Sequence, residues 1–207
     1  NGVRLTPDAS FADCPAPDPF QQGMSFCSDT RYIRLLEAVG TDIVELTGDH
    51  FQDWGVQAME LTLEMYRQRG WPVYGGGANS EAARQAVTLE HNGTRLAFIG
   101  CNPVGPTAVW ATENQPGAAA CEDYAWMLEE ITRLRGEGYL PIVTFQYYEV
   151  YVHPPSEHQQ RNFRAAVDAG AVIVSGSQAH FPQTMEFYNG AFIHFGLGNL
   201  FFDQMDI

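Results

Sequence analysis

Basic residues are scarce in this chain. Eleven arginines and lysines stand against 25 aspartates and glutamates among 207 residues, which gives a formal net charge of −14. No basic run is long enough to follow a phosphate backbone, so we expect neither nucleic acid nor an anionic membrane as a partner. The acidic surface by itself selects no substrate.

Other absences narrow the class of protein further. No apolar stretch is long enough to span a bilayer, and the first residues lack the basic and then apolar pattern of a signal peptide. No Cys-x-x-Cys pair is present, so we expect no structural zinc. No Gly-x-Ser-x-Gly turn is present, so the sequence offers no nucleophile motif for a serine hydrolase. The glycine-rich stretches "GGGAN" (75–79) and "GLGNLF" (196–201) lack the other residues of phosphate-binding loops.

The four cysteines, Cys14, Cys27, Cys101 and Cys121, are even in number and lie in proline-containing, loop-like segments. Two local disulfides, 14 to 27 and 101 to 121, are one interpretation, and four reduced, buried cysteines are the other. The loop-like surroundings favour disulfides and therefore an oxidising, extracytoplasmic compartment.

Strand and helix patterns alternate after a loop-rich lead-in at residues 1–28. We expect Asp29, Asp53 and Ser156 to cap helices, with Gln159 completing a capping box after Ser156. Asn-Gly pairs at 92–93 and 189–190 predict hairpin turns. This order predicts an α/β fold with a largely parallel sheet flanked by helices and an antiparallel hairpin at its C-terminal end. The helical patterns are 30–40, 53–70, 122–138 and 156–169, and the strand patterns are 42–46, 72–74, 88–101, 140–148 and 171–176.

The length suits one domain over residues 1–207. The abrupt ends, "NGVRL" and "QMDI", indicate a fragment of a longer protein.

Polar side chains follow three of the expected strands, and the carboxyl ends of parallel strands meet at one edge of a sheet. Carboxylate, amide oxygen and imidazole groups suit a divalent cation and phosphate-ester chemistry. Taken alone, His180 is more often a structural residue, Asp49 a turn residue and Asp53 a helix cap. The candidate residues are Asp49 and His50 after "DIVEL" (42–46), Gln146 and Glu149 after the run "PIVTF" (141–145) within the strand pattern 140–148, and Ser177, Gln178 and His180 after "AVIVSG" (171–176).

Four segments, taken in order, resemble the CapA family of poly-γ-glutamate capsule biosynthesis proteins, which is similar to the calcineurin-like metallophosphoesterases. The resemblance implies a metallophosphoesterase-like layered sheet flanked by helices, incomplete at the N-terminus because the family's opening Gly-Asp strand has no counterpart in residues 1–27. The segments are "VGTDIVELTGDHFQDWG" (39–55), "VYGGGANSEAAR" (73–84), "LAFIGCN" (96–102) and "GAVIVSGSQAHFPQTMEFYNGAFIHFGLGNLFFDQ" (170–204).

The resemblance also implies roles for single residues. Asp49 matches a metal ligand, His180 matches a metal ligand or a substrate-facing residue, and His50 matches a substrate-facing histidine. In our first hypothesis Asp49 and His180 hold a divalent metal, expected to be Mg, Mn or Zn. Gln146 and Gln178 stand where the family commonly has histidines; an amide can bind a hard cation but cannot relay a proton. We assign catalytic roles to His50, Gln146 and Glu149, and substrate binding to Ser177 and Gln178.

Two hypotheses follow for the function. The first is an extracytoplasmic protein of capsule or cell-surface polymer biosynthesis with a metal-dependent, phosphoesterase-type hydrolase site. Its partner would be an anionic cell-surface polymer or its precursor. The alternative is a non-catalytic polymer-binding or assembly protein on the same fold.

Overall fold

Six strands form the central sheet of the structure, a computed structural model that describes residues 11–12 and 26–199. The four inner strands are mutually parallel, and each edge strand is antiparallel to its neighbour. The predicted parallel sheet with a C-terminal antiparallel hairpin is therefore confirmed, and the hairpin at 92–93 forms the other edge. The order is β11 (Met185–Tyr188), β12 (Ala191–His194), β10 (Ile173–Ala179), β9 (Leu140–Val150), β7 (Thr94–Cys101) and β6 (Val87–His91).

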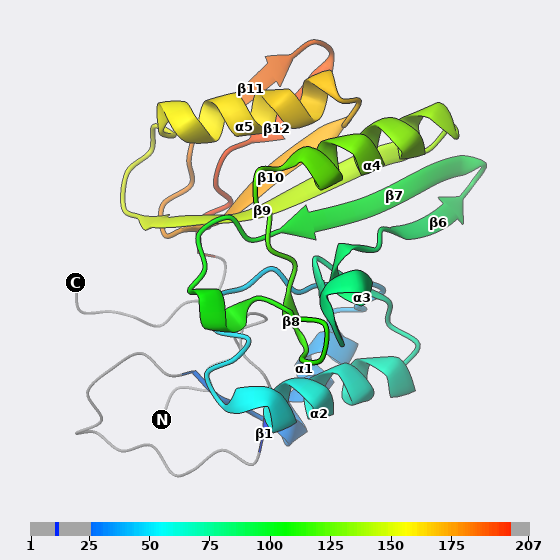
Figure 1. The fold of residues 1–207 in the computed structure, drawn as a ribbon, viewed down its shortest axis with the longest axis vertical. Helices are drawn as coiled ribbons and strands as arrows, with labels where there is room; N and C mark the ends of the chain where they lie inside the picture. The colour runs from blue at the N-terminus through cyan, green and yellow to red at the C-terminus, as the bar shows by residue number, and fades with distance from the viewer. Residues whose placement is uncertain (1–10, 13–25, 200–207) are drawn as a thin grey trace.

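Two helices, α4 (Ala125–Gly136) and α5 (Glu157–Asp168), cover one face of this sheet (Figure 1). In α4 the buried residues Met127, Ile131 and Leu134 recur at helical spacing. Between the helices and the sheet, the ring of Phe163 on α5 stacks on Phe145 of β9 with centroids 4.8 Å apart. Phe195 stacks on the same ring at 5.5 Å. This aromatic layer is the main hydrophobic core.

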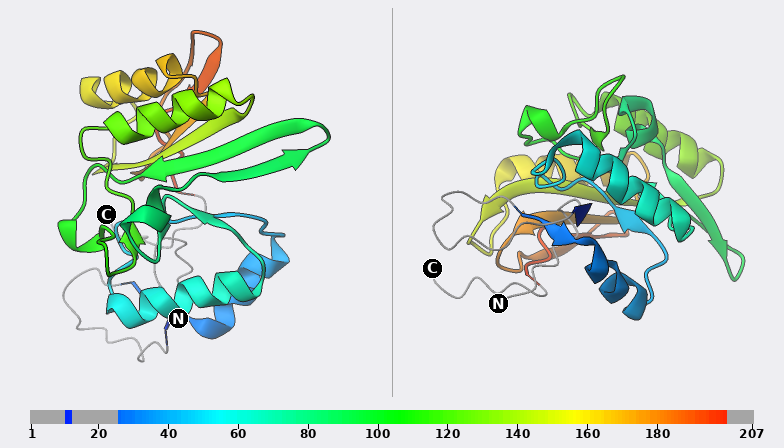
Figure 2. Two further views of the ribbon diagram at one scale, coloured as in Figure 1. Left: turned by 45° about the vertical axis from the view of Figure 1, so that its right-hand side comes forward. Right: turned by 90° about the horizontal axis from the view of Figure 1, so that it is seen from below.

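The first half of the chain lies against the opposite face of the sheet (Figures 1 and 2). It contains the parallel strand pairs β1–β2 and β3–β4, the antiparallel pair β5–β8, and a second hydrophobic cluster under α2. Its elements are β1 (Phe11–Ala12), β2 (Ser28–Asp29), η1 (Thr30–Tyr32), α1 (Ile33–Ala38), β3 (Val44–Glu45), α2 (Gly55–Gln68), β4 (Val73–Tyr74), β5 (Gly76–Gly77), α3 (Ser80–Arg84), η2 (Thr107–Val109) and β8 (Gly117–Ala118).

Glycine allows the two halves to approach closely. A Cβ atom added to Gly100 of β7 would lie 2.6 Å from Thr144 Oγ1 and 3.0 Å from Thr47 Cγ2. Gly75, at φ +72°, meets Thr47 in the same way. Only glycine therefore lets the segment after β3 pack directly on the sheet.

Two of the three expected helix caps differ from the prediction. Asp29 caps η1, which leads into α1, by accepting a hydrogen bond from the Arg31 N–H. The N-cap of α2 is Trp54, without a side-chain bond, so the prediction that Asp53 caps this helix is wrong. Ser156 caps α5 as expected, but Gln159 turns its amide to Phe195 O instead of completing a capping box.

The predicted disulfide between Cys101 and Cys121 is present. The predicted bridge between Cys14 and Cys27 involves Cys14, which lies outside the described residues. Within residues 11–12 and 26–199, no helix has the length and apolarity needed to cross a bilayer. The assignment of residues 1–207 to one domain stays a prediction.

Candidate functional site

The segment after β3 is held from both sides. Asn102, which follows β7 and is fully buried, donates from Nδ2 to the carbonyl of Thr47 over 2.9 Å. The Thr47 N–H donates to the Glu45 carboxylate at 2.7 Å. Asn102 Oδ1 in turn accepts from the N–H groups of Val104 and Gly105. These bonds fix where Asp49 and His50 emerge at the carboxyl edge of the sheet.

Asp49 meets the loop after β10. Gln178 Nε2 donates to Asp49 Oδ2 over 3.1 Å and so joins residues 129 positions apart. Gln178 has a left-handed backbone, φ 77°, where the β9–β10 register shifts between Ser177 and Ala179. Such a bulge redirects a side chain at some cost in backbone strain, which is common at functional sites. The bulge thus aims Gln178 at Asp49.

The Asp49 carboxylate has an unusual environment. Burial raises the pKa of Asp49 above its ordinary value, against the opposing effects of His50 and of a hydrogen bond from the Asp49 backbone N–H, and the charges of Asp53 and Glu149 raise it further. Its Oδ1 atom is buried and has no hydrogen-bond partner among residues 11–12 and 26–199. A negative charge here is therefore poorly compensated by the described side chains.

His50 is oriented by Asp53, the residue expected to be a helix cap. His50 Nδ1 lies 2.8 Å from Asp53 Oδ2, and His50 Nε2 lies 3.9 Å from Asp49 Oδ1. Asp53 Oδ2 also accepts the backbone N–H of Phe26, whose ring packs edge-on against the imidazole. A carboxylate at Nδ1 fixes the ring and directs Nε2 toward Asp49.

His180 is set between two polar partners and one ring. Its Nε2 lies 3.4 Å from Glu149 Oε1, and its Nδ1 lies 3.1 Å from the side-chain amide of Asn199. Tyr151 stacks on the imidazole with ring centroids 4.7 Å apart. If the Asn199 amide presents its oxygen to Nδ1, then Nδ1 carries the proton and Nε2 has a free lone pair that can bind a cation. If the amide presents its NH₂ instead, Nδ1 accepts and Nε2 carries the proton.

Gln146 lies deeper than the other candidates. It is 1% exposed, and its Oε1 accepts a hydrogen bond from Ser177 Oγ over 3.0 Å. Ser177 and Gln146 are direct neighbours in the β9–β10 register. Gln146 therefore supports Ser177 from behind.

All seven candidates gather at the carboxyl ends of β3, β9 and β10, in the contacts Asp49–Gln178, Glu149–His180 and Gln146–Ser177, with His50 beside Asp49. Carboxylate, amide and imidazole groups are the types of ligand that a hard divalent cation binds. Asp49 Oδ1, which has no hydrogen-bond partner among the described residues, offers an anionic oxygen. Within the described ranges, however, no three His, Cys, Asp or Glu side chains stand close enough to hold a metal ion alone. The described residues therefore supply, at most, part of a coordination sphere.

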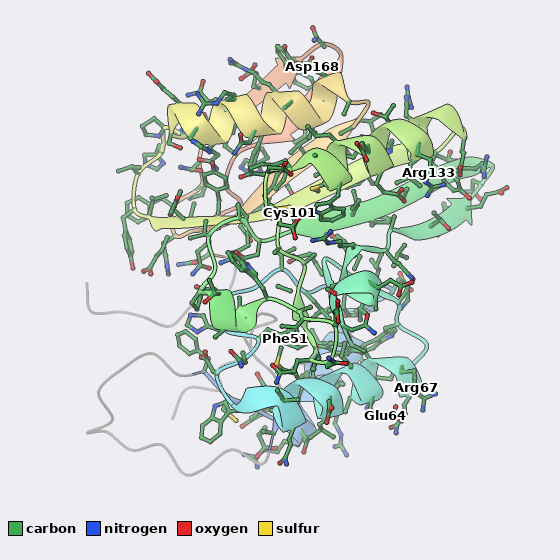
Figure 3. The ribbon with its side chains drawn as sticks, in the orientation of Figure 1. Phe51, Glu64, Arg67, Cys101, Arg133 and Asp168 are labelled. Atoms are coloured by element: carbon green, nitrogen blue, oxygen red, sulfur yellow. A yellow bond between two sulfur atoms is a disulfide. The ribbon has the colours of Figure 1, made fainter. Side chains whose placement is uncertain are left out.

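The described arginines form their ion pairs away from the candidate site. Six of the described arginines form ion pairs with carboxylates, and none of these pairs includes a candidate residue. Arg67 with Glu64 on α2, and Arg133 on α4, lie toward one side of the molecule, away from Phe51 on the segment after β3 (Figure 3). The carboxylates at the site have no guanidinium partner among them.

Sequence reasoning missed three supporting residues: Asp53 as the partner of His50, Asn102 and Asn199. Asn102 and Asn199 both follow strands at the carboxyl edge, so the rule that found the other candidates would have found them too. Asp53 gave no such signal, because its sequence context is that of a helix cap.

The architecture first defines a class: a mixed α/β protein whose six-stranded, helix-flanked sheet is consistent with the metallophosphoesterase-like fold predicted from the sequence. Residues 9–204 match the family model described as "Bacterial capsule synthesis protein PGA_cap". The chain therefore belongs to this bacterial capsule synthesis family, and the resemblance to CapA is confirmed.

Two curated relatives are similar over most of the chain. The capsule biosynthesis protein CapA of Bacillus anthracis is 27% identical over 176 residues, 83% of this chain. The PGA biosynthesis protein CapA of Bacillus subtilis is 27% identical over 173 residues, also 83% of this chain. The matches cover 43% and 45% of the relatives' own lengths, so the chain corresponds to less than half of each.

Proposed function

We propose that the protein acts outside the cytoplasm and hydrolyses a phosphoester in an anionic cell-surface polymer or its precursor, with the help of a divalent cation. The contact between Gln178 and Asp49 Oδ2 carries this proposal, because it joins two loops at a carboxylate whose other oxygen, the buried Oδ1, has no donor among the described residues. A buried carboxylate oxygen without a partner is costly until a proton or a cation occupies it. Membership of a capsule synthesis family supports the polymer as the partner.

Each candidate has a role in this proposal. Asp49 and His180 hold the cation (Mg, Mn or Zn), which when bound neutralises charge on the phosphoryl group and activates water. His50, oriented by Asp53, protonates the leaving oxygen. The remaining residues support these groups and the substrate. Glu149, whose Oε1 lies 3.4 Å from His180 Nε2, adds negative charge beside the cation held there; Ser177 and Gln178 contact the substrate, and Gln146 positions Ser177.

A second function, polymer binding without catalysis, is favoured by two observations. No three potential ligands cluster within residues 11–12 and 26–199, and two amides stand where the family commonly has histidines. Under this reading the same edge of the sheet binds the polymer, and His50 has no chemical role. The disulfide between Cys101 and Cys121 supports an oxidising, extracytoplasmic location for either function.

The deciding experiment measures metal content and metal affinity of the full-length protein, by mass spectrometry and by calorimetry with Mg²⁺, Mn²⁺ and Zn²⁺. We expect wild type to bind a metal, and Asp49→Ala and His180→Ala to lose it. Asp168→Ala is the matched control, because Asp168 is an exposed carboxylate on the far end of α5 (Figure 3).

Catalysis is then tested with His50→Gln and a chromogenic phosphodiester. We expect this variant to keep its metal and its melting temperature but to lose turnover, because only the proton donor is removed. An empty wild type whose melting temperature ignores all three metals, and which hydrolyses nothing, contradicts the proposal and leaves the binding function.

A further inference from the structure

Beside the polar site lies a set of exposed rings that the proposed chemistry does not use. We call Tyr151, His153 and Phe181 the aromatic shelf. The Phe181 ring is central: it meets Tyr151 edge-on with centroids 6.1 Å apart and stacks on His153 at 5.6 Å. Tyr151 is 36% and Phe181 41% exposed. Adjoining exposed rings on a soluble protein commonly mark a binding surface.

The shelf is rigidly built. Its two loops, 150–155 and 180–184, are tied together by backbone bonds from His180 N to Val150 O at 2.9 Å and from Thr184 N to His153 O at 3.0 Å. The buried side chain of Gln183 donates to the carbonyls of Val152 and Pro154. Rings held in this way lose little conformational entropy on binding a ligand.

The shelf is continuous with the candidate site. The Tyr151 hydroxyl donates to Glu149 Oε1 over 2.8 Å, and the same Oε1 lies 3.4 Å from His180 Nε2. One face of Tyr151 is already taken by His180. A ligand whose charged group is held at Asp49 and His180 therefore has the shelf as an adjoining apolar support.

Charge decides which ligand fits. A polycarboxylate chain would place further carboxylates beside Glu149, which is in none of the described arginine ion pairs, whereas a neutral ring on the shelf leaves only the ligand's phosphate charge to the cation at Asp49 and His180. A sugar ring presents polarised C–H groups, which suit the negative face of an aromatic ring, and hydroxyls, which suit a carboxylate acceptor. The shelf and Glu149 offer both.

We propose that the aromatic shelf binds a saccharide ring, so that the substrate is a glycosyl phosphate unit with its phosphoester at Asp49 and His180 and its ring on Tyr151 and Phe181. The placing of the phosphoester rests on the proposed function, whereas binding of the ring does not require the metal. Tyr151 and Phe181 are then specificity-determining residues that distinguish a saccharide polymer from poly-γ-glutamate.

The test is calorimetric titration of the full-length protein with neutral tetrasaccharides of glucose and of N-acetylglucosamine, and with poly-γ-glutamate of matched length, in EDTA and again in Mg²⁺. We expect one of the saccharides to bind under both conditions and poly-γ-glutamate not to bind in EDTA. Phe181→Ala and Tyr151→Ala should each weaken saccharide binding about ten-fold, the loss of one ring contact. Tyr151→Phe, which keeps the ring, should lose less.

Phe187→Ala is the control, because Phe187 is an 82% exposed ring on β11 that belongs to neither the shelf nor the site. If saccharide binding persists in EDTA and in Asp49→Ala while no phosphoesterase activity is found, that result would contradict the proposed hydrolysis and support saccharide binding at the shelf. The shelf proposal is overturned if neither saccharide binds, if both alanine variants bind as wild type does, or if only poly-γ-glutamate depends on Tyr151.

Discussion

The two faces of the central sheet are covered by different kinds of side chain. On the face covered by α4 and α5, large rings fill the space, and Phe145, Phe163 and Phe195 are at most 2% exposed. On the opposite face, small and polar residues contact the segment after β3; for example, Thr47 packs against Gly100, beside Thr144. One face is packed like an ordinary core, whereas the other is a close backbone contact.

The second face also leaves polar atoms unsatisfied. Thr47 Oγ1 and Asp49 Oδ1 are buried without hydrogen-bond partners in the described part of the chain, and both belong to the segment that carries His50. Buried groups of this kind cost stability in the absence of a ligand. The aromatic face therefore stabilises the fold. The glycine-lined face, where Gly100 meets the segment after β3, holds functional groups in positions that do not favour stability.

The largest effect should come from the aromatic face. Phe163→Ala removes a fully buried ring that contacts Phe145, Tyr147 and Phe195, and should lower the free energy of unfolding by about 3–5 kcal/mol. Denaturant titration measures this loss. Phe187→Ala, at an exposed ring, should change it by less than about 0.5 kcal/mol. A similar loss in both variants would break the comparison between the two faces.

An intermediate effect is expected on the glycine-lined face. Gly100→Ala places a methyl group 2.6 Å from Thr144 Oγ1 and 3.0 Å from Thr47 Cγ2, so the segment after β3 must move. Overpacking of this kind costs about 1–3 kcal/mol. Because Asp49 and His50 lie on that segment, metal affinity should fall as well, which Phe163→Ala should not cause in the folded protein.

Gly136→Ala is the control for that substitution. A Cβ at Gly136, in the last turn of α4, would meet nothing within 4 Å. Alanine there should leave metal affinity unchanged and raise stability by roughly 0.5–1 kcal/mol, since glycine disfavours a helix. If Gly100→Ala behaves like Gly136→Ala, the close contact between the halves does not set the site.

Much of this arrangement could be predicted from local patterns. The buried strands, the two Asn-Gly hairpins and the helix after Ser156 are encoded within short windows, and each is present. The rule that ligands gather at the carboxyl edge of parallel strands brought together residues as far apart as Asp49 and Gln178, which are in contact. Pattern and topology therefore located the candidate site.

What failed depends on side-chain contacts that the local helix and strand patterns do not encode. Asp53 has the local context of a cap, but the His50 ring and the Phe26 N–H, 27 residues away, compete for its carboxylate. The contact of Tyr151 with Phe181 depends on how two loops close over each other, which no periodicity encodes. Tertiary contacts of this kind override local preferences.

The smallest effect should appear at Asp49 and should depend on pH. Because its pKa is raised in the folded state above the ordinary value of 3.8, stability is present below that value and is lost as pH rises through the folded-state pKa. With metal removed by chelation, Asp49→Asn, which resembles the protonated form, should therefore be more stable than wild type near neutral pH, by no more than about 1 kcal/mol. The gain should vanish in acid, as thermal unfolding over a pH series would measure, and Asp168→Asn should show no such gain. A destabilised Asp49→Asn protein at neutral pH would mean that the ionised carboxylate is well compensated, and the contrast between the two faces would lose its main support.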